Sequence, residues 1–252
     1  SEEIFLTEGS DILKLREKIE KIGKPLKDWN VKIYRGIITG FNEAFIIDTE
    51  TRNRILANCK TEEERKRTEE IIKPVLRGRD IGRYYYKWAG LWVICTFPSK
   101  KINIEDYPSL KSYLASFGDR LLQDGKPGHR KKTNHKWFET QDNIAYYPEF
   151  EKEKVVWQRV AQDQKFTIVP PGFYCEATTH FITTKTEKND RFLRYILGIL
   201  NSKLFGFAFY KFYMGGGIEG EIKGTFIERF PIPPITQQNQ KIANQIVNLV
   251  DQ

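Results

Sequence analysis

The chain has few of the residues on which many catalytic and metal sites depend. Its 252 residues include only three histidines, three cysteines and one methionine. With so few histidines, a Ser-His-Asp arrangement cannot be assembled with conviction. Cys175 and His180 are five positions apart, but no second pair of ligand type lies near them, so the sequence predicts no zinc or other metal site. The odd, scattered cysteines exclude a disulfide framework and favour reduced thiols in a cytosol.

Long hydrophobic runs and an excess of acidic residues are also missing. No stretch approaches the roughly 18 apolar residues that a membrane span needs, and the N-terminus lacks the pattern of a signal peptide, so we expect no membrane partner. A hydrophobic content of 40% with 13% aromatic residues is typical of a folded globular protein. The net charge of +8 favours a polyanionic partner, above all nucleic acid, with an ordinary basic soluble protein as the alternative.

Two short patterns near the C-terminus resemble motifs of enzymes, one glycine-rich and one with a glutamate and a lysine. Residues 215–220 fit G-x-G-x-x-G, but a helix rather than a strand is predicted before them and Glu219 would repel a phosphate, so a nucleotide site is disfavoured. Glu221 and Lys223 have the E-x-K spacing of metal-dependent nucleases. No acidic partner is evident on a preceding strand, and cleavage needs several convergent oxygens. A nuclease therefore stays open only as an alternative, and we predict no catalytic residue in this chain.

The pattern of apolar residues predicts an α+β fold with strands dominating the middle. A long buried helix is expected near residues 190–212 and an amphipathic helix at the C-terminus, after the break at Pro231, Pro233 and Pro234. A charged helix capped by Thr61 is expected to end at Pro74. The remaining expected helices lie at 10–22 and around 110–121, and the expected strands at 31–36, 44–48, 91–95, 155–159, 166–169 and 181–184.

Binding chemistry is concentrated in two basic segments. Residues 125–136 carry five Lys or Arg and two His with no acid, in a loop that Trp137 and Phe138 are expected to anchor. Such a loop suits phosphates or guanine edges, and a solvated surface loop is the alternative. Residues 76–86 combine arginines, glycines and tyrosines, and Asp80 either orients an arginine or forms a structural pair. The candidate DNA-contacting residues are Arg77, Arg79, Arg83, His129, Arg130, Lys131, Lys132 and Lys136.

Four segments, in order, carry a resemblance to a known family. They are residues 35–47 (RGIITGFNEAFII), 73–81 (KPVLRGRDI), 200–204 (LNSKL) and 230–234 (FPIPP), followed by the Gln-rich segment 237–242. Together they resemble the TaqI-like C-terminal specificity domain, the target-recognition module of adenine-specific DNA methyltransferases and Type IIG enzymes. The closing pattern is also similar to Type I restriction specificity subunits. The resemblance covers about residues 25–250.

This resemblance implies double-stranded DNA as a partner, together with a methyltransferase domain or subunit in a prokaryotic cytoplasm. The parent protein would use S-adenosylmethionine to methylate adenine N6, and Mg²⁺ if a nuclease is fused. No cofactor is expected in this chain, whose Pro231-Ile232-Pro233-Pro234 segment is no substitute for the Asn-Pro-Pro-aromatic motif of such enzymes. Residues 1–24 are expected to form a helical linker toward an upstream domain, 25–235 the recognition domain and 236–252 a C-terminal helix.

The resemblance also extends the set of candidate residues. In the family, one half of the recognition domain varies with the DNA target, and residues in that half are further candidates for base readout. The glycine loop after the long helix is a candidate for phosphate contact or for a structural turn. Thr39, Gly40 and Asn42 are expected to form a turn that determines the fold. A generic single-strand binder is a further alternative. The added candidates are Gln158, Arg159, Thr178, Thr179, His180, Gly215, Gly216 and Gly217.

Overall fold

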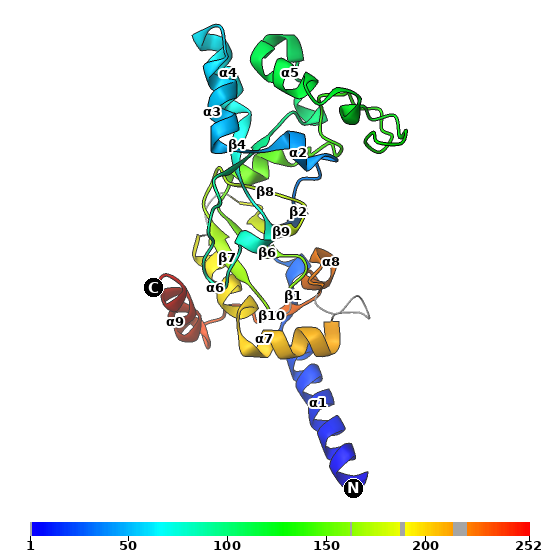
Figure 1. Ribbon diagram of the computed structural model, residues 1–252. Helices are drawn as coiled ribbons and strands as arrows, with labels where there is room; N and C mark the ends of the chain where they lie inside the picture. Colours follow the sequence, from blue (N-terminus) through cyan, green and yellow to red (C-terminus); the bar gives the residue numbers. More distant parts are fainter. Residues whose placement is uncertain (1, 162, 187–189, 214–220) are drawn as a thin grey trace.

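The computed structural model describes residues 2–161, 163–186, 190–213 and 221–252. It is elongated, with α1 projecting from one end and α3, α4 and α5 at the other (Figure 1). The helices are α1 (Glu2–Ile22), α2 (Asn42–Phe45), α3 (Thr49–Ala57), α4 (Glu62–Glu70), α5 (Pro108–Ala115), α6 (Asp190–Leu200), α7 (Lys203–Ala208), α8 (Gly224–Ile227) and α9 (Gln240–Val250). The strands are β1 (Lys24–Pro25), β2 (Val31–Arg35), β3 (Ile46–Asp48), β4 (Ile72–Leu76), β5 (Leu91–Ile94), β6 (Lys154–Gln158), β7 (Phe166–Val169), β8 (Tyr174–Cys175), β9 (Thr179–Thr184) and β10 (Pro231–Ile232). The predicted α+β class is confirmed.

A central antiparallel sheet of order β2-β9-β6-β7 separates two hydrophobic cores. Side chains alternate between the faces of a strand. Val156 and Phe181 therefore belong to the first core, and Val155, Trp157 and Ile182 belong to the second. Because both faces of β6 are covered, its apolar residues are continuous rather than alternating with polar ones, which explains why residues 155–159 read as a buried strand.

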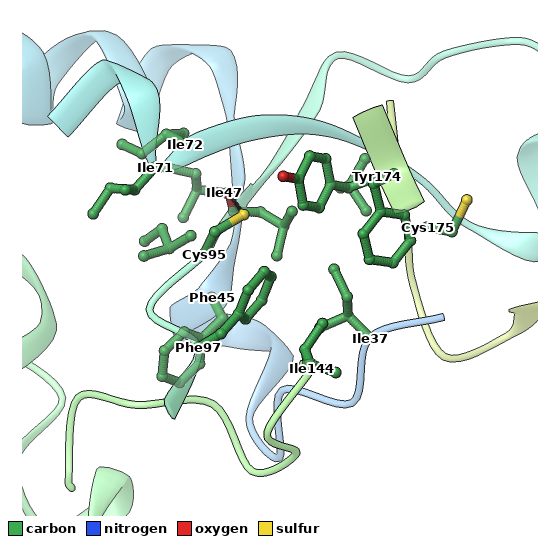
Figure 2. Packing of buried hydrophobic residues seen from close by; sticks show 14 of the residues in the cluster. Ile37, Phe45, Ile47, Ile71, Ile72, Cys95, Phe97, Ile144, Tyr174 and Cys175 are labelled. Atoms are coloured by element: carbon green, nitrogen blue, oxygen red, sulfur yellow. Dashed lines mark hydrogen bonds between the residues drawn. The ribbon is translucent and has the colours of Figure 1, made fainter. Parts of the chain in front are cut away.

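The first core lies between the central sheet and a smaller mixed sheet of order β3-β5-β4-β8. Figure 2 shows side chains from this sheet, from α2 and from the connecting loops converging, among them Phe45, Phe97 and Tyr174. Cys95 and Cys175 are buried here as free thiols, and burial raises their pKa values to about 12 and about 11. Thiols with such high pKa values are inert packing groups, in line with the expected reduced cysteines.

The expected end of the charged helix at Pro74 is wrong. Helix α4 ends at Glu70, and Pro74 lies inside strand β4. The strand pairs with β5 through Pro74 and with β8 from Val75 onward. Proline is tolerated because it stands at this change of partner.

The second core contains α6 and α7, and it corrects the expectation of one long helix near residues 190–212. The two helices are bent by 58° at a break next to Asn201. The buried Asn201 amide donates from Nδ2 to Phe166 O at 2.9 Å and accepts from Phe166 N at 3.2 Å. The side chain thus pairs with the edge of β7 as a strand would, and the helix axis turns there. In the described part of the chain, no single helix is long and apolar enough to cross a membrane, although this bent pair passes by length and composition.

The segment that follows α1 and the C-terminal helix both lie at this second core. Strand β1, directly after α1, pairs antiparallel with β10 of the Pro-Ile-Pro segment. The predicted C-terminal amphipathic helix is present as α9, which buries Ala243 and Val247 against the second core. Arg194 of α6 binds Asp251 and Glu153, with Nη1 to Oε1 of Glu153 at 2.7 Å.

Candidate nucleic-acid interface

A polar cleft of about 420 Å³ opens where β4, β6 and β8 end. It brings together residues that are far apart in the sequence and come from both sheets. Four of the predicted DNA-contacting residues converge on it, together with three polar residues that sequence reasoning did not select, namely Asn42, Glu43 and Glu176. The lining residues are Asn42, Glu43, Ile46, Arg77, Arg79, Leu91, Gln158, Glu176 and Thr178.

The two arginines at this cleft play different parts. Arg77 is fixed by Asp80, with Nε to Oδ2 at 3.0 Å and Nη2 to Oδ1 at 2.8 Å, and this hydrogen bonding raises the arginine pKa. Asp80 also accepts from the backbone N of Arg77 at 2.8 Å, so the pair shapes the turn. Arg79 is exposed, and no ion pair or hydrogen bond is found for it within the described residues. Of the two arginines, Arg79 is therefore the one whose charge is unpaired within the described part of the chain.

Gly78, between these arginines, must be glycine because its backbone lies very close to Gln158 and Thr178. A Cβ on Gly78 would lie 2.8 Å from Gln158 Cγ and 2.9 Å from Thr178 O. The Gly78 amide donates to Thr178 Oγ1 at 2.8 Å. The Thr178 hydroxyl in turn donates to Oε2 of Glu176, which also accepts the backbone N of Thr178 at 3.1 Å. A continuous hydrogen-bond chain therefore holds the floor of the cleft.

Gln158 and Arg159 were predicted together, but the pleat sends them to opposite faces of the central sheet. Gln158 lines the cleft. Arg159 lies on the other face, where its Nε is 3.8 Å from Oε1 of Glu221. The pair Gln158 and Thr179 is in register on β6 and β9, but the Thr179 side chain is buried and donates to Glu176 O at 2.7 Å. The prediction that Thr179 contacts bases is therefore wrong for this chain, because its hydroxyl closes a turn.

His180 lies on the same face as Arg159 and stacks on Trp157 at 5.5 Å between ring centroids. Burial, followed by the charges of Arg159 and Arg35, lowers its pKa from 6.5 to about 4. The imidazole is therefore neutral at physiological pH, and its Nδ1 is buried without a hydrogen-bond partner within the described residues. The side chain therefore packs on Trp157 of the second core.

Glu221 and Lys223, the alternative nuclease pair, bind each other. Lys223 Nζ is 3.1 Å from Oε2 of Glu221, and Arg159 approaches the other oxygen. Among the residues that the structure describes, no group of three or more His, Cys, Asp or Glu could hold a metal ion. The geometry is that of a carboxylate between two cations rather than of convergent metal ligands.

Arg130 is a second correction to the predicted DNA contacts. Its side chain is 3% exposed. All five guanidinium donors bind backbone carbonyls: Nε and Nη2 bind Leu121 O, Nη1 binds Thr39 O and Glu139 O, and Nη2 also binds Trp137 O. An arginine has five N–H donors, so none remains for a phosphate. Burial lowers its pKa to about 10. Arg130 therefore anchors the basic loop from within.

The rest of the basic loop projects outward from the end of the molecule near α5 (Figure 1). Asp124, one residue before the loop, binds His129 Nδ1 at 2.7 Å and Lys126 Nζ at 3.3 Å. The Asp124 carboxylate therefore neutralises part of the positive charge of the loop. Backbone bonding from Lys126, with the bond from His129, lowers the pKa of Asp124 to about 2. Lys131, Lys132 and Lys136 are exposed and can face a phosphate. Phe138 is buried and anchors the end of the loop, as expected.

Arg83 lies apart from Arg77 and Arg79. Its guanidinium donates to Asn201 O at the break between α6 and α7. The adjoining cleft, of about 520 Å³, is formed with Tyr84, Tyr85 and the end of α9. The structure therefore does not bring the three predicted arginines into one cluster.

Residues 39–42 form a turn next to the cleft. Thr39 Oγ1 donates to Asn42 Oδ1 at 2.6 Å and accepts from Phe41 N at 3.1 Å, while Gly40 has a φ of 79°. This confirms the expected structural turn, and it also places Asn42 at the cleft. The glycines 215–217 lie outside the described residues, so their role stays a prediction.

Comparisons with known proteins fit this architecture. The chain matches the TaqI-like C-terminal specificity domain over residues 73–232. Its fold is similar to part of the type IIG restriction endonuclease BpuSI, with a TM-score of 0.59 and 13% identity over 97% of this chain and 28% of that one. It is also similar to part of the type IIL restriction-modification enzyme MmeI, solved in complex with DNA, with a TM-score of 0.52 and 12% identity over 90% of this chain and 28% of that one. The chain belongs to the family of TaqI-like C-terminal specificity domains.

Proposed function

We propose that this chain recognises a specific double-stranded DNA sequence for a restriction-modification enzyme. The observation that carries the proposal is the convergence of Arg77, Arg79, Gln158 and Thr178 on one cleft. Arginine and glutamine make bidentate contacts with guanine and adenine edges in the major groove. Membership of a specificity-domain family and the exposed lysines of the basic loop support the same function.

We infer that the chain positions an adenine-N6 methyltransferase that uses S-adenosylmethionine, and an endonuclease where one is fused. The catalytic parts would lie elsewhere in the parent protein, since the chain spans 28% of each of the two similar enzymes. The expected setting is a prokaryotic cytoplasm.

Selection of bound sites from a random duplex library tests the recognition proposal. The purified chain, at near-physiological salt and with metal omitted, is expected to enrich one short motif. Competition by single strands is expected to be weak, and affinity is expected to fall steeply with salt because phosphate contacts release counterions. Salt-sensitive binding without any enriched motif would contradict sequence-specific recognition by this chain. Preference for single strands would favour the generic binder.

Arg79→Gln is expected to weaken binding to the enriched site about ten-fold while the thermal unfolding temperature stays unchanged. Arg79 is exposed and makes no ion pair or hydrogen bond within the described residues, so the substitution removes a contact with DNA and none within the protein. Lys14→Gln, which removes an exposed lysine on α1, is the matched control and should leave affinity unchanged. Titration by fluorescence anisotropy measures both. Equal affinities for the wild type and Arg79→Gln would remove Arg79 from the interface.

A further inference from the structure

Glu176 is a carboxylate at the floor of the cleft with an unusual environment. It is 7% exposed, although acidic residues are rarely so buried unless they are paired. No ion pair is found for it within the described residues, because the nearby Arg77 is held by Asp80. Its Oε2 accepts two hydrogen bonds from Thr178, and the structure gives its other oxygen, Oε1, no hydrogen-bond partner among the described residues.

The backbone of Glu176 is fixed from three sides. Its N donates to Leu76 O at 2.9 Å, and its O accepts from Thr179 N at 2.9 Å. Gly36 packs so closely that a Cβ there would lie 2.0 Å from Glu176 O. With the side chain also held by Thr178, the position of the carboxylate is set before any ligand arrives. Such preorganisation is what a selective polar contact requires.

The cleft gives this carboxylate neighbours that suit one kind of base pair. A carboxylate only accepts hydrogen bonds, and the only donors on the major-groove edges are cytosine N4 and adenine N6. The exposed Arg79 lines the same cleft and presents a planar fork that fits guanine O6 and N7. A C·G pair offers both partners at once, whereas an A·T pair offers no guanine.

Resting on the proposed function, we propose that Glu176 is a specificity-determining residue that reads the N4 amino group of cytosine in a C·G pair of the target site. Arg79 contacts the guanine of the same pair. Thr178 acts as the positioning residue, because its hydroxyl holds Oε2 and leaves Oε1 for the base.

Site selection with three variants tests this inference. Glu176→Gln keeps an acceptor for Thr178 but replaces the free oxygen by an N–H donor. It is expected to lower the preference for cytosine at one C·G position about ten-fold, with the other positions of the motif unchanged. Glu176→Asp keeps the acceptor and should retain the cytosine with weaker binding. Glu20→Gln, an exposed carboxylate on α1 that lies outside the cleft and pairs with Arg16 at 2.9 Å, is the control and should leave the motif unchanged.

Thermal unfolding of each variant shows that it is folded at the temperature of selection. An unchanged motif with Glu176→Gln, or a change confined to an A·T position, would overturn the assignment of Glu176 while leaving the recognition function intact. Failure of the wild type to enrich any motif would instead remove the proposed function, and this inference with it.

Discussion

Replacing Arg130 with methionine is expected to lower the free energy of unfolding by about 3 to 5 kcal/mol. Four carbonyl groups would lose this donor. Thr39 O and Glu139 O keep hydrogen bonds from Gln141 N and Gln123 Nε2, whereas Leu121 O and Trp137 O have no other donor among the described residues. Buried carbonyls without partners are costly, and methionine supplies no donor. Urea unfolding followed by circular dichroism measures the loss.

A variant of the neighbouring Lys131 distinguishes a residue that anchors the loop from one that contacts DNA. It is exposed, so Lys131→Met should leave stability within about 0.5 kcal/mol of the wild type. If it contacts a phosphate, the slope of log affinity against log salt should fall by about one. Near-normal stability of Arg130→Met, combined with a loss of DNA affinity, would restore Arg130 to the interface and contradict its anchoring role.

Lowering the pH from about 7.5 to about 5 is expected to cost about 2 kcal/mol of stability through His180 alone. Burial, with the charges of Arg159 and Arg35, lowers its pKa to about 4 from an ordinary value of 6.5. Between these values the unfolded chain binds a proton that the folded chain does not. Stability is therefore lost as the pH falls through this window, and the loss levels off once the folded chain is also protonated.

The measurement is the difference in unfolding free energy between the two pH values, for the wild type and for His180→Gln. Glutamine does not titrate, so the pH-dependent loss should be smaller in the variant by about 2 kcal/mol. Other titrating groups are common to both proteins and cancel in this difference. Equal pH dependence in the two proteins would mean that His180 is more accessible to protons than its burial against Trp157 implies.

Some parts of the candidate site could be predicted from sequence because local chemistry determines them. The turn at Thr39, Gly40 and Asn42 depends on a positive φ and on side-chain bonds that span three residues. The pair of Arg77 with Asp80 also lies within three residues, and the sequence had left it open whether Asp80 was structural or orienting. Glu176 was missed, since a lone glutamate after a strand gives no signal until Gly36, Leu76 and Thr178 surround it.

The amino-acid sequence by itself determined the α+β class, the family, most strands and the basic character of the loop, because these depend on residue spacing, composition and ordered motifs. The tertiary structure alone decided which charged groups remain accessible. Arg130 and Lys131 are adjacent in the chain, yet one is bound to Thr39, 91 residues away, and the other is exposed. Desolvation and hydrogen-bond partners depend on such long-range contacts, which no local pattern contains.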